Sequence, residues 1–136
     1  MNLLDEFSAR SLSHFGNEGF VEFSRRLRED GQVCCTRCTA CDSRVFPPRS
    51  HCPDCLGEEL GWEPFPTGGT IHAFTTQARA LRFAAPAVIG VVDVPGLGKV
   101  LAPIAGRMEE LSIGQRVEPE VIEAAEGIAY FRFVAT

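Results

Sequence analysis

Long apolar runs and an excess of positive charge are both missing from this 136-residue sequence. No stretch approaches the roughly 20 apolar residues that a membrane-spanning helix requires, and the first seven residues lack the basic and apolar regions of a secretion signal. The formal net charge is -5, with a single Trp and a single Tyr, whereas proteins that bind nucleic acid usually present a basic face. We therefore expect a soluble, cytoplasmic protein with neither a membrane nor a nucleic-acid partner.

Recognisable catalytic arrangements are missing as well. The sequence contains no Ser/His/Asp arrangement, no phosphate-binding Gly-rich loop and no carboxylate pair in a familiar setting. The three histidines are His14, His51 and His72. A thiol nucleophile would need such a base beside it, but four of the six cysteines are assigned to a metal site below, and His51 adjoins one of these ligand cysteines. We predict that the chain has no catalytic residues of its own.

What the sequence does contain is two Cys-x-x-Cys motifs, at residues 38–41 and 52–55. Each motif can form a tight turn that directs two thiolates at one point, and four sulfur ligands suit tetrahedral zinc, although iron accepts the same set. With all four positions filled by protein, no position is left for water or substrate, so the metal would be structural. We predict that the ligands of a structural Zn²⁺ are Cys38, Cys41, Cys52 and Cys55.

Two further cysteines, Cys34 and Cys35, precede the first motif and leave its register open, because Cys35 and Cys38 also read Cys-x-x-Cys. We favour the register that begins at Cys38. It places Cys34 and Cys35 on a strand leading into the site, as small buried or half-buried side chains. A redox-sensitive or alternative-ligand role for this pair stays open. Disulfides would need an oxidising compartment, which we do not expect here.

Three parts follow one another along the chain. Between residues 17 and 30 apolar side chains recur at helical spacing, which predicts an amphipathic helix that ends at Gly31. We assign residues 1–31 to an N-terminal helical segment, 32–61 to a zinc ribbon and 62–136 to a barrel.

The pattern changes to that of strands after a Gly- and Pro-rich stretch at 61–69, which is typical of a connector. The predicted strands cover about 70–78, 87–94, 98–106, 116–123 and 128–135. A tight turn at 95–98 makes the second and third strands antiparallel neighbours, and residues 108–111 suit a helical turn. Five short strands with edges to hide suit a small closed barrel. We predict a mainly β protein in which a rubredoxin-like zinc ribbon precedes a five-stranded OB-type barrel; a small sandwich is the alternative.

These features in this order resemble one protein family. Beyond the helix and the cysteine motifs, the similarity rests on Pro47-Pro48-Arg49, Trp62, Gly69-Thr70-Ile71 and Ile113-Gly114-Gln115-Arg116-Val117. The family is the acyl-CoA-associated zinc-ribbon and OB-fold family, once known as domain of unknown function 35. Asp42 departs from the family pattern, which usually has glycine after the second cysteine of the motif.

The resemblance implies an accessory subunit that binds a thiolase-like or hydratase-like enzyme in a hetero-oligomer acting on acyl-CoA. We expect a thiolase-type partner, which would supply the catalytic groups for cleavage or condensation of a 3-ketoacyl-CoA, while this chain supports it and helps to enclose the CoA thioester. CoA or acyl-CoA would then be a ligand at the interface of the complex, with Arg79, Arg82 and Lys99 as candidate contacts. Two alternatives stay open: a module that binds single-stranded nucleic acid and an electron carrier with iron in the four-cysteine site.

Overall fold

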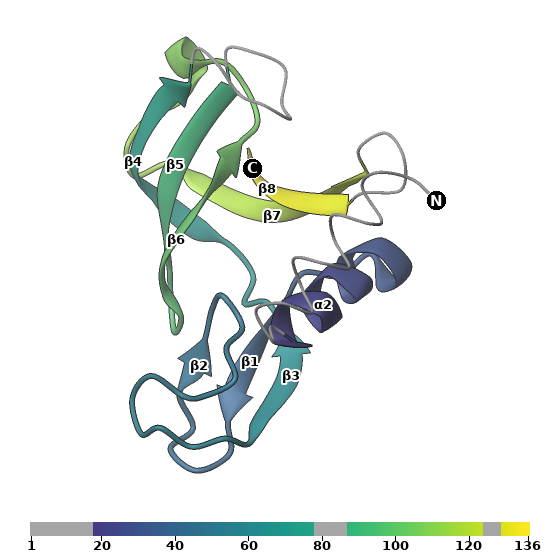
Figure 1. Ribbon diagram of the computed structural model, residues 1–136. Helices are drawn as coiled ribbons and strands as arrows, with labels where there is room; N and C mark the ends of the chain where they lie inside the picture. Colours follow the sequence, from purple (N-terminus) through teal and green to yellow (C-terminus); the bar gives the residue numbers. More distant parts are fainter. Residues whose placement is uncertain (1–17, 78–86, 124–128) are drawn as a thin grey trace. The chain divides into compact units, whose positions relative to one another are not determined.

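The computed structural model describes residues 18–77, 87–123 and 129–136. The chain forms two compact units, with the boundary between Pro64 and Phe65. The described part of the first unit holds a helix and a three-stranded sheet, and the second unit holds a closed barrel (Figure 1). This confirms the predicted mainly β fold with a helix near the N-terminus. None of the described helices has the length and apolar character needed to cross a membrane.

The helix begins as α2, Glu18–Arg25, and continues as a π-helical turn, η1, over Arg26–Asp30. Gly31 ends it in the left-handed conformation, with φ 62°, as predicted, because glycine has no Cβ to clash there. The predicted apolar face is buried at Phe23 and Leu27. The part of the predicted N-terminal helical segment that precedes residue 18 lies outside the described residues.

Aromatic contacts hold the helix against the rest of the first unit. The Phe23 and Phe46 rings form a T-shaped contact with a centroid distance of 5.7 Å. The Arg26 guanidinium lies 5.0 Å from the centre of the Trp62 ring, a cation–π geometry. A Cβ added to Gly19 would lie 3.5 Å from Pro48 Cβ, so the helix backbone approaches this loop closely.

The sheet of the first unit has the order β2-β1-β3. Its strands are β1, Cys34–Cys38, β2, Arg44–Val45, and β3, Leu60–Pro64, and both neighbours of β1 are antiparallel to it. The prediction of a connector over residues 61–69 is therefore wrong for residues 61–64, which belong to β3. Trp62 pairs with Thr36 across the sheet; the glycine and prolines around it mark the ends of a short edge strand, where proline is tolerated.

The second unit is a barrel with the strand order β4-β5-β6-β8-β7. Its strands are β4, Gly69–Gln77, β5, Ala87–Val94, β6, Gly98–Ile104, β7, Arg116–Glu123, and β8, Ala129–Ala135. The predicted helical turn is η2, Met108–Glu110. Neighbouring strands are antiparallel except β6 and β8, which are parallel. This is the five-stranded, OB-like barrel that the sequence predicts.

Alternation along β5 builds the barrel core. Val88, Val92 and Val94 are buried on the inner face, as the period of two requires, together with Ile71, Val117 and Phe133 from other strands. Gly69 fits between strands because a Cβ there would lie only 2.6 Å from the backbone oxygen of Asp93. Glycine is therefore required where the backbones of β4 and β5 approach each other closely at this position.

Candidate metal centre

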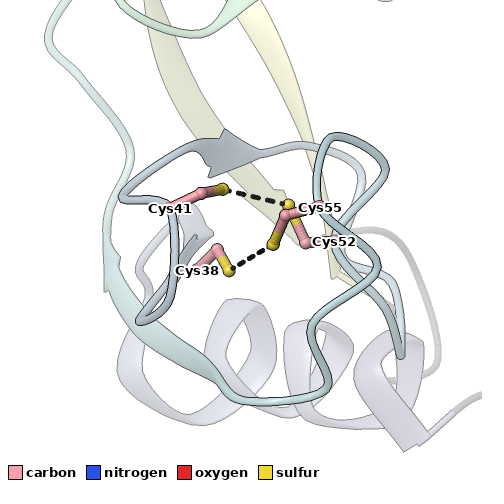
Figure 2. Close-up of side chains that lie close together, drawn as sticks. All are labelled: Cys38, Cys41, Cys52 and Cys55. Atoms are coloured by element: carbon pink, nitrogen blue, oxygen red, sulfur yellow. Dashed lines mark hydrogen bonds between the residues drawn. The ribbon is translucent and has the colours of Figure 1, made fainter.

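Two turns of the first unit bring four cysteines together (Figure 2). The Sγ atoms of Cys38, Cys41, Cys52 and Cys55 all lie within 4.8 Å of one another. Cys38 Sγ is 3.5 Å from Cys55 Sγ, and Cys41 Sγ is 3.6 Å from Cys52 Sγ. Tetrahedral zinc with Zn–S bonds of about 2.3 Å separates its sulfurs by about 3.8 Å. The cluster therefore has the spacing of a four-thiolate zinc site, and none of the six cysteines is in a disulfide.

The two turns have the same backbone design. In the first, Asp42 N–H donates to Cys38 O at 2.9 Å and Cys38 N–H to Ser43 O at 2.8 Å. In the second, the N–H of Leu56 donates to Cys52 O at 2.9 Å, and the N–H of Cys52 donates to the carbonyl of residue 57 at 2.8 Å. Each turn therefore presents its two sulfurs on the same scaffold.

This design imposes the left-handed conformation on the residue after each motif. Asp42 and Leu56 both have φ 64°. Aspartate is among the residues that tolerate this conformation, whereas a large apolar residue such as leucine rarely adopts it. The departure of Asp42 from the family glycine is thus accommodated, and the Asp42 carboxylate also accepts a hydrogen bond from Arg37 at 3.0 Å.

The cluster has a buried side and an exposed side. Cys38 and Cys52 are buried beside Val45 and the partly buried Leu60, whereas Cys41 and Cys55 are exposed. A Cβ on Gly57 would lie 3.3 Å from Cys55 Sγ, so a side chain there would crowd the sulfurs. The buried apolar residues on one side and the tight packing around Gly57 on the other hold the sulfurs in position.

The chemistry of the four donors fits a dication. The hydroxyl and the backbone N–H of Ser43 lower the pKa of Cys41 to about 6. The N–H of Gly57 likewise favours the thiolate of Cys55, yet hydrogen bonds to neighbouring cysteine sulfurs raise the pKa of that thiol to about 12. Four thiols this close cannot all ionise without a cation, and Zn²⁺ binds cysteine as thiolate. The residues present are therefore able to hold the metal.

Cys34 and Cys35 take no part in the cluster. Both lie on β1 and are buried, as predicted for the register that begins at Cys38. Burial raises the pKa of Cys35 to about 11, and the nearby Glu63 carboxylate adds to the shift. A redox-sensing thiol is usually exposed and acidic, so the environment of Cys35 disfavours the redox role that the sequence left open.

A charged group on the same sheet was missed by the sequence reasoning. Glu63 on β3 accepts hydrogen bonds from Arg37 Nε at 2.9 Å and from Arg44 Nε at 2.8 Å. These guanidinium groups hold the pKa of the Glu63 carboxyl below its ordinary value, Arg37 most strongly. Only strand register reveals the arrangement, because the three residues come from three different strands.

The remaining candidate residues are not members of the cysteine cluster, and some fall outside the described residues. Arg79 and Arg82, the candidate CoA contacts, belong to the segment 78–86, which is not described. Lys99 is exposed on β6, with Asp93 as its cross-strand neighbour. His72 is exposed on β4, and His51 contacts the Glu58 carboxylate at 3.1 Å.

Comparison with known proteins agrees with this division into a metal-binding ribbon and a barrel. Residues 28–61 match the rubredoxin-like zinc ribbon domain of ChsH2, and residues 62–121 match its C-terminal OB-fold domain. The fold and the cysteine cluster define a protein that joins a zinc ribbon to an OB-type barrel. The chain belongs to the DUF35 family of zinc-ribbon and OB-fold proteins.

Two solved structures share the fold at low sequence identity. One, described as the Ltp2-ChsH2(DUF35) aldolase, has a TM-score of 0.72 and 19% identity over 84% of this chain and 92% of that chain. The other is a DUF35 protein of unknown function from Sulfolobus solfataricus, with a TM-score of 0.61 and 14% identity over 100% of both chains. These similarities confirm the architecture of the chain.

Proposed function

We propose that this chain is a non-catalytic accessory subunit of a hetero-oligomeric enzyme that makes or breaks carbon–carbon bonds in acyl-CoA thioesters, with a thiolase-type partner. The observation that carries the proposal is the match of both domains to ChsH2. The solved ChsH2 neighbour is described as part of an aldolase formed with Ltp2. Aldolases and thiolases both cleave or form a carbon–carbon bond, so the predicted chemistry and this neighbour belong to one reaction class.

The metal in this proposal is structural zinc held by Cys38, Cys41, Cys52 and Cys55. Zinc would supply folding free energy to a ribbon that is too small to build a large apolar core. In zinc-finger peptides such binding is worth about 10 to 16 kcal/mol at neutral pH. The four cysteines fill the coordination shell, so the role of the site is to hold the two turns and the strands from which they project.

The barrel and the helix supply the surfaces through which the chain would act. In the proposal the partner brings the reacting groups, and this chain positions the partner and encloses the CoA thioester. Lys99 and the segment that contains Arg79 and Arg82 are the candidate contacts for the CoA phosphates, because guanidinium and ammonium groups bind phosphate oxygens.

The proposal is tested by reconstitution. A tagged chain is expressed in its native host, the co-purifying subunit is identified, and both proteins are then produced separately. Thiolysis of a 3-ketoacyl-CoA and retro-aldol cleavage of a 3-hydroxyacyl-CoA are assayed with this chain alone, the partner alone and the pair. We expect turnover of one substrate by the pair and none by this chain alone. Turnover of either substrate by this chain alone would refute the accessory role.

The identity of the metal is tested on the same preparation. Zinc gives a colourless protein with one metal per chain by elemental analysis, whereas iron in four thiolates absorbs visible light. A coloured native protein with stoichiometric iron would refute the role of accessory subunit and favour that of an electron carrier.

A further inference from the structure

Leu56 combines two unfavourable properties at the edge of the metal cluster. Its backbone is left-handed, with φ 64°, and its side chain is 73% exposed. Leucine in this conformation suffers a clash between its Cβ and the backbone, and its exposed isobutyl group gains nothing from burial. Glycine would satisfy the turn without either penalty.

The turn itself does not explain the side chain. Its geometry is fixed by the backbone hydrogen bond from Leu56 N–H to Cys52 O at 2.9 Å, in which the isobutyl group takes no part. The equivalent residue of the first turn, Asp42, tolerates the conformation and hydrogen-bonds Arg37. A strained residue of this kind points to a function outside the free chain.

The neighbourhood of Leu56 is a small apolar centre bordered by acids. The exposed Ala40 approaches this turn, since a Cβ on Gly57 would lie 3.6 Å from Ala40 Cβ. Asp54, Glu58 and Glu59 are exposed in the same segment. His51, in the same segment, contacts the Glu58 carboxylate at 3.1 Å. A four-thiolate zinc site would add further negative charge to this surface, which we call the knuckle face: Ala40, Asp54, Leu56, Glu58 and Glu59.

We propose that Leu56 is the anchor by which the knuckle face docks onto the catalytic partner subunit, in an apolar pocket bordered by Lys or Arg. This inference rests on the proposed function and names one contact surface of that complex. Protein interfaces usually combine an apolar core with a polar, solvent-accessible rim. The acidic rim selects the partner by charge complementarity and speeds the encounter with a basic surface.

The test compares Leu56→Gly with Asp42→Gly, its match in the first turn. Both variants place glycine at a position with left-handed backbone conformation and so relieve its strain, but only Leu56→Gly removes an exposed apolar side chain. Zinc content and thermal stability of each purified variant are measured first. Affinity is then measured by calorimetry against the subunit that co-purifies with the wild-type chain. We expect full zinc content in both, at least tenfold weaker binding for Leu56→Gly and wild-type affinity for Asp42→Gly.

A charge variant tests the rim. Glu58→Lys should slow association several-fold at low salt, and the difference from wild type should shrink as salt rises. Equal partner affinity of Leu56→Gly and wild type would overturn the inference. A purified chain that forms a dimer through Leu56 would also overturn it, by giving the surface to a second copy. If only the proposed function is wrong, the result is different: the wild-type chain still binds a subunit through Leu56, but that subunit has no acyl-CoA activity.

Discussion

Replacement of Glu63 by Gln should destabilise the metal ribbon by about 1 to 2 kcal/mol. The carboxylate accepts hydrogen bonds from Arg37 and Arg44 at 2.8 to 3.3 Å. Hydrogen bonds to charged groups are worth about 1.5 to 3 kcal/mol, and exposed ion pairs at most about 1 kcal/mol. Glu63 is 25% exposed and its two partners 34% and 33%, so solvent screening lowers the total towards the smaller figure.

The assay is suited to the ribbon because the single Trp of the chain, Trp62, lies on β3 next to Glu63. Urea unfolding is followed by Trp fluorescence at fixed free zinc. For a unit of the size of Met1–Pro64, the midpoint of thermal unfolding should fall by roughly 4 to 8 °C for each kcal/mol of destabilisation. A double-mutant cycle with Arg44→Gln separates the ion pair from other effects of each substitution.

The pH dependence of that cycle has a defined sign. The pKa of Glu63 is lowered in the folded chain, so its stabilisation is present above the unfolded value of about 4.3 and is lost as pH falls through the folded pKa. The coupling free energy should therefore be constant between pH 6.5 and 8, where zinc stays bound. A coupling below about 0.3 kcal/mol, the limit for independent sites, would show that the Glu63–Arg44 pair contributes nothing to the stability of the ribbon.

Three further predictions concern the cysteines, the strained turn and the barrel. Cys55→Ser should lose zinc and partner binding together, whereas Cys34→Ser should retain both; zinc analysis of the Cys34 variant checks the ligand register, and a loss of metal there would contradict it. Leu56→Gly should stabilise the zinc-loaded chain by about 0.5 to 1 kcal/mol, because relief of roughly 1 to 2 kcal/mol of strain exceeds the added chain entropy; lower resistance to urea would count against this. Gly69→Ala should destabilise the barrel by about 1 to 3 kcal/mol through overpacking with normal zinc content, and an unchanged unfolding midpoint would mean that the strands separate easily at Asp93.

The elements that the sequence predicts well are those with a strong local pattern. The strands of the barrel show the alternation of apolar residues, and Gly31 ends the helix through its own backbone preference. Motif spacing left Cys35 and Cys38 as an alternative pair, and the structure brings together the sulfurs of the favoured set, Cys38, Cys41, Cys52 and Cys55.

The features that escaped prediction depend on contacts between distant segments. β3 is short and flanked by glycine and proline, so its pattern is that of a connector until β1 is placed beside it. The bonds from Arg37 and Arg44 to Glu63 need the register of three strands. The strain at Leu56 arises from its backbone conformation, which the presence of a leucine in the sequence does not predict.

The sulfur contacts carry a consequence for how the ribbon responds to its surroundings. Each short contact joins one turn to the other: Cys38 with Cys55, and Cys41 with Cys52. A metal bound here would therefore act as a cross-link between sequence-distant segments, comparable to a disulfide but reversible by chelation. The supply of free zinc in the cell would then govern how much of the chain is competent to assemble.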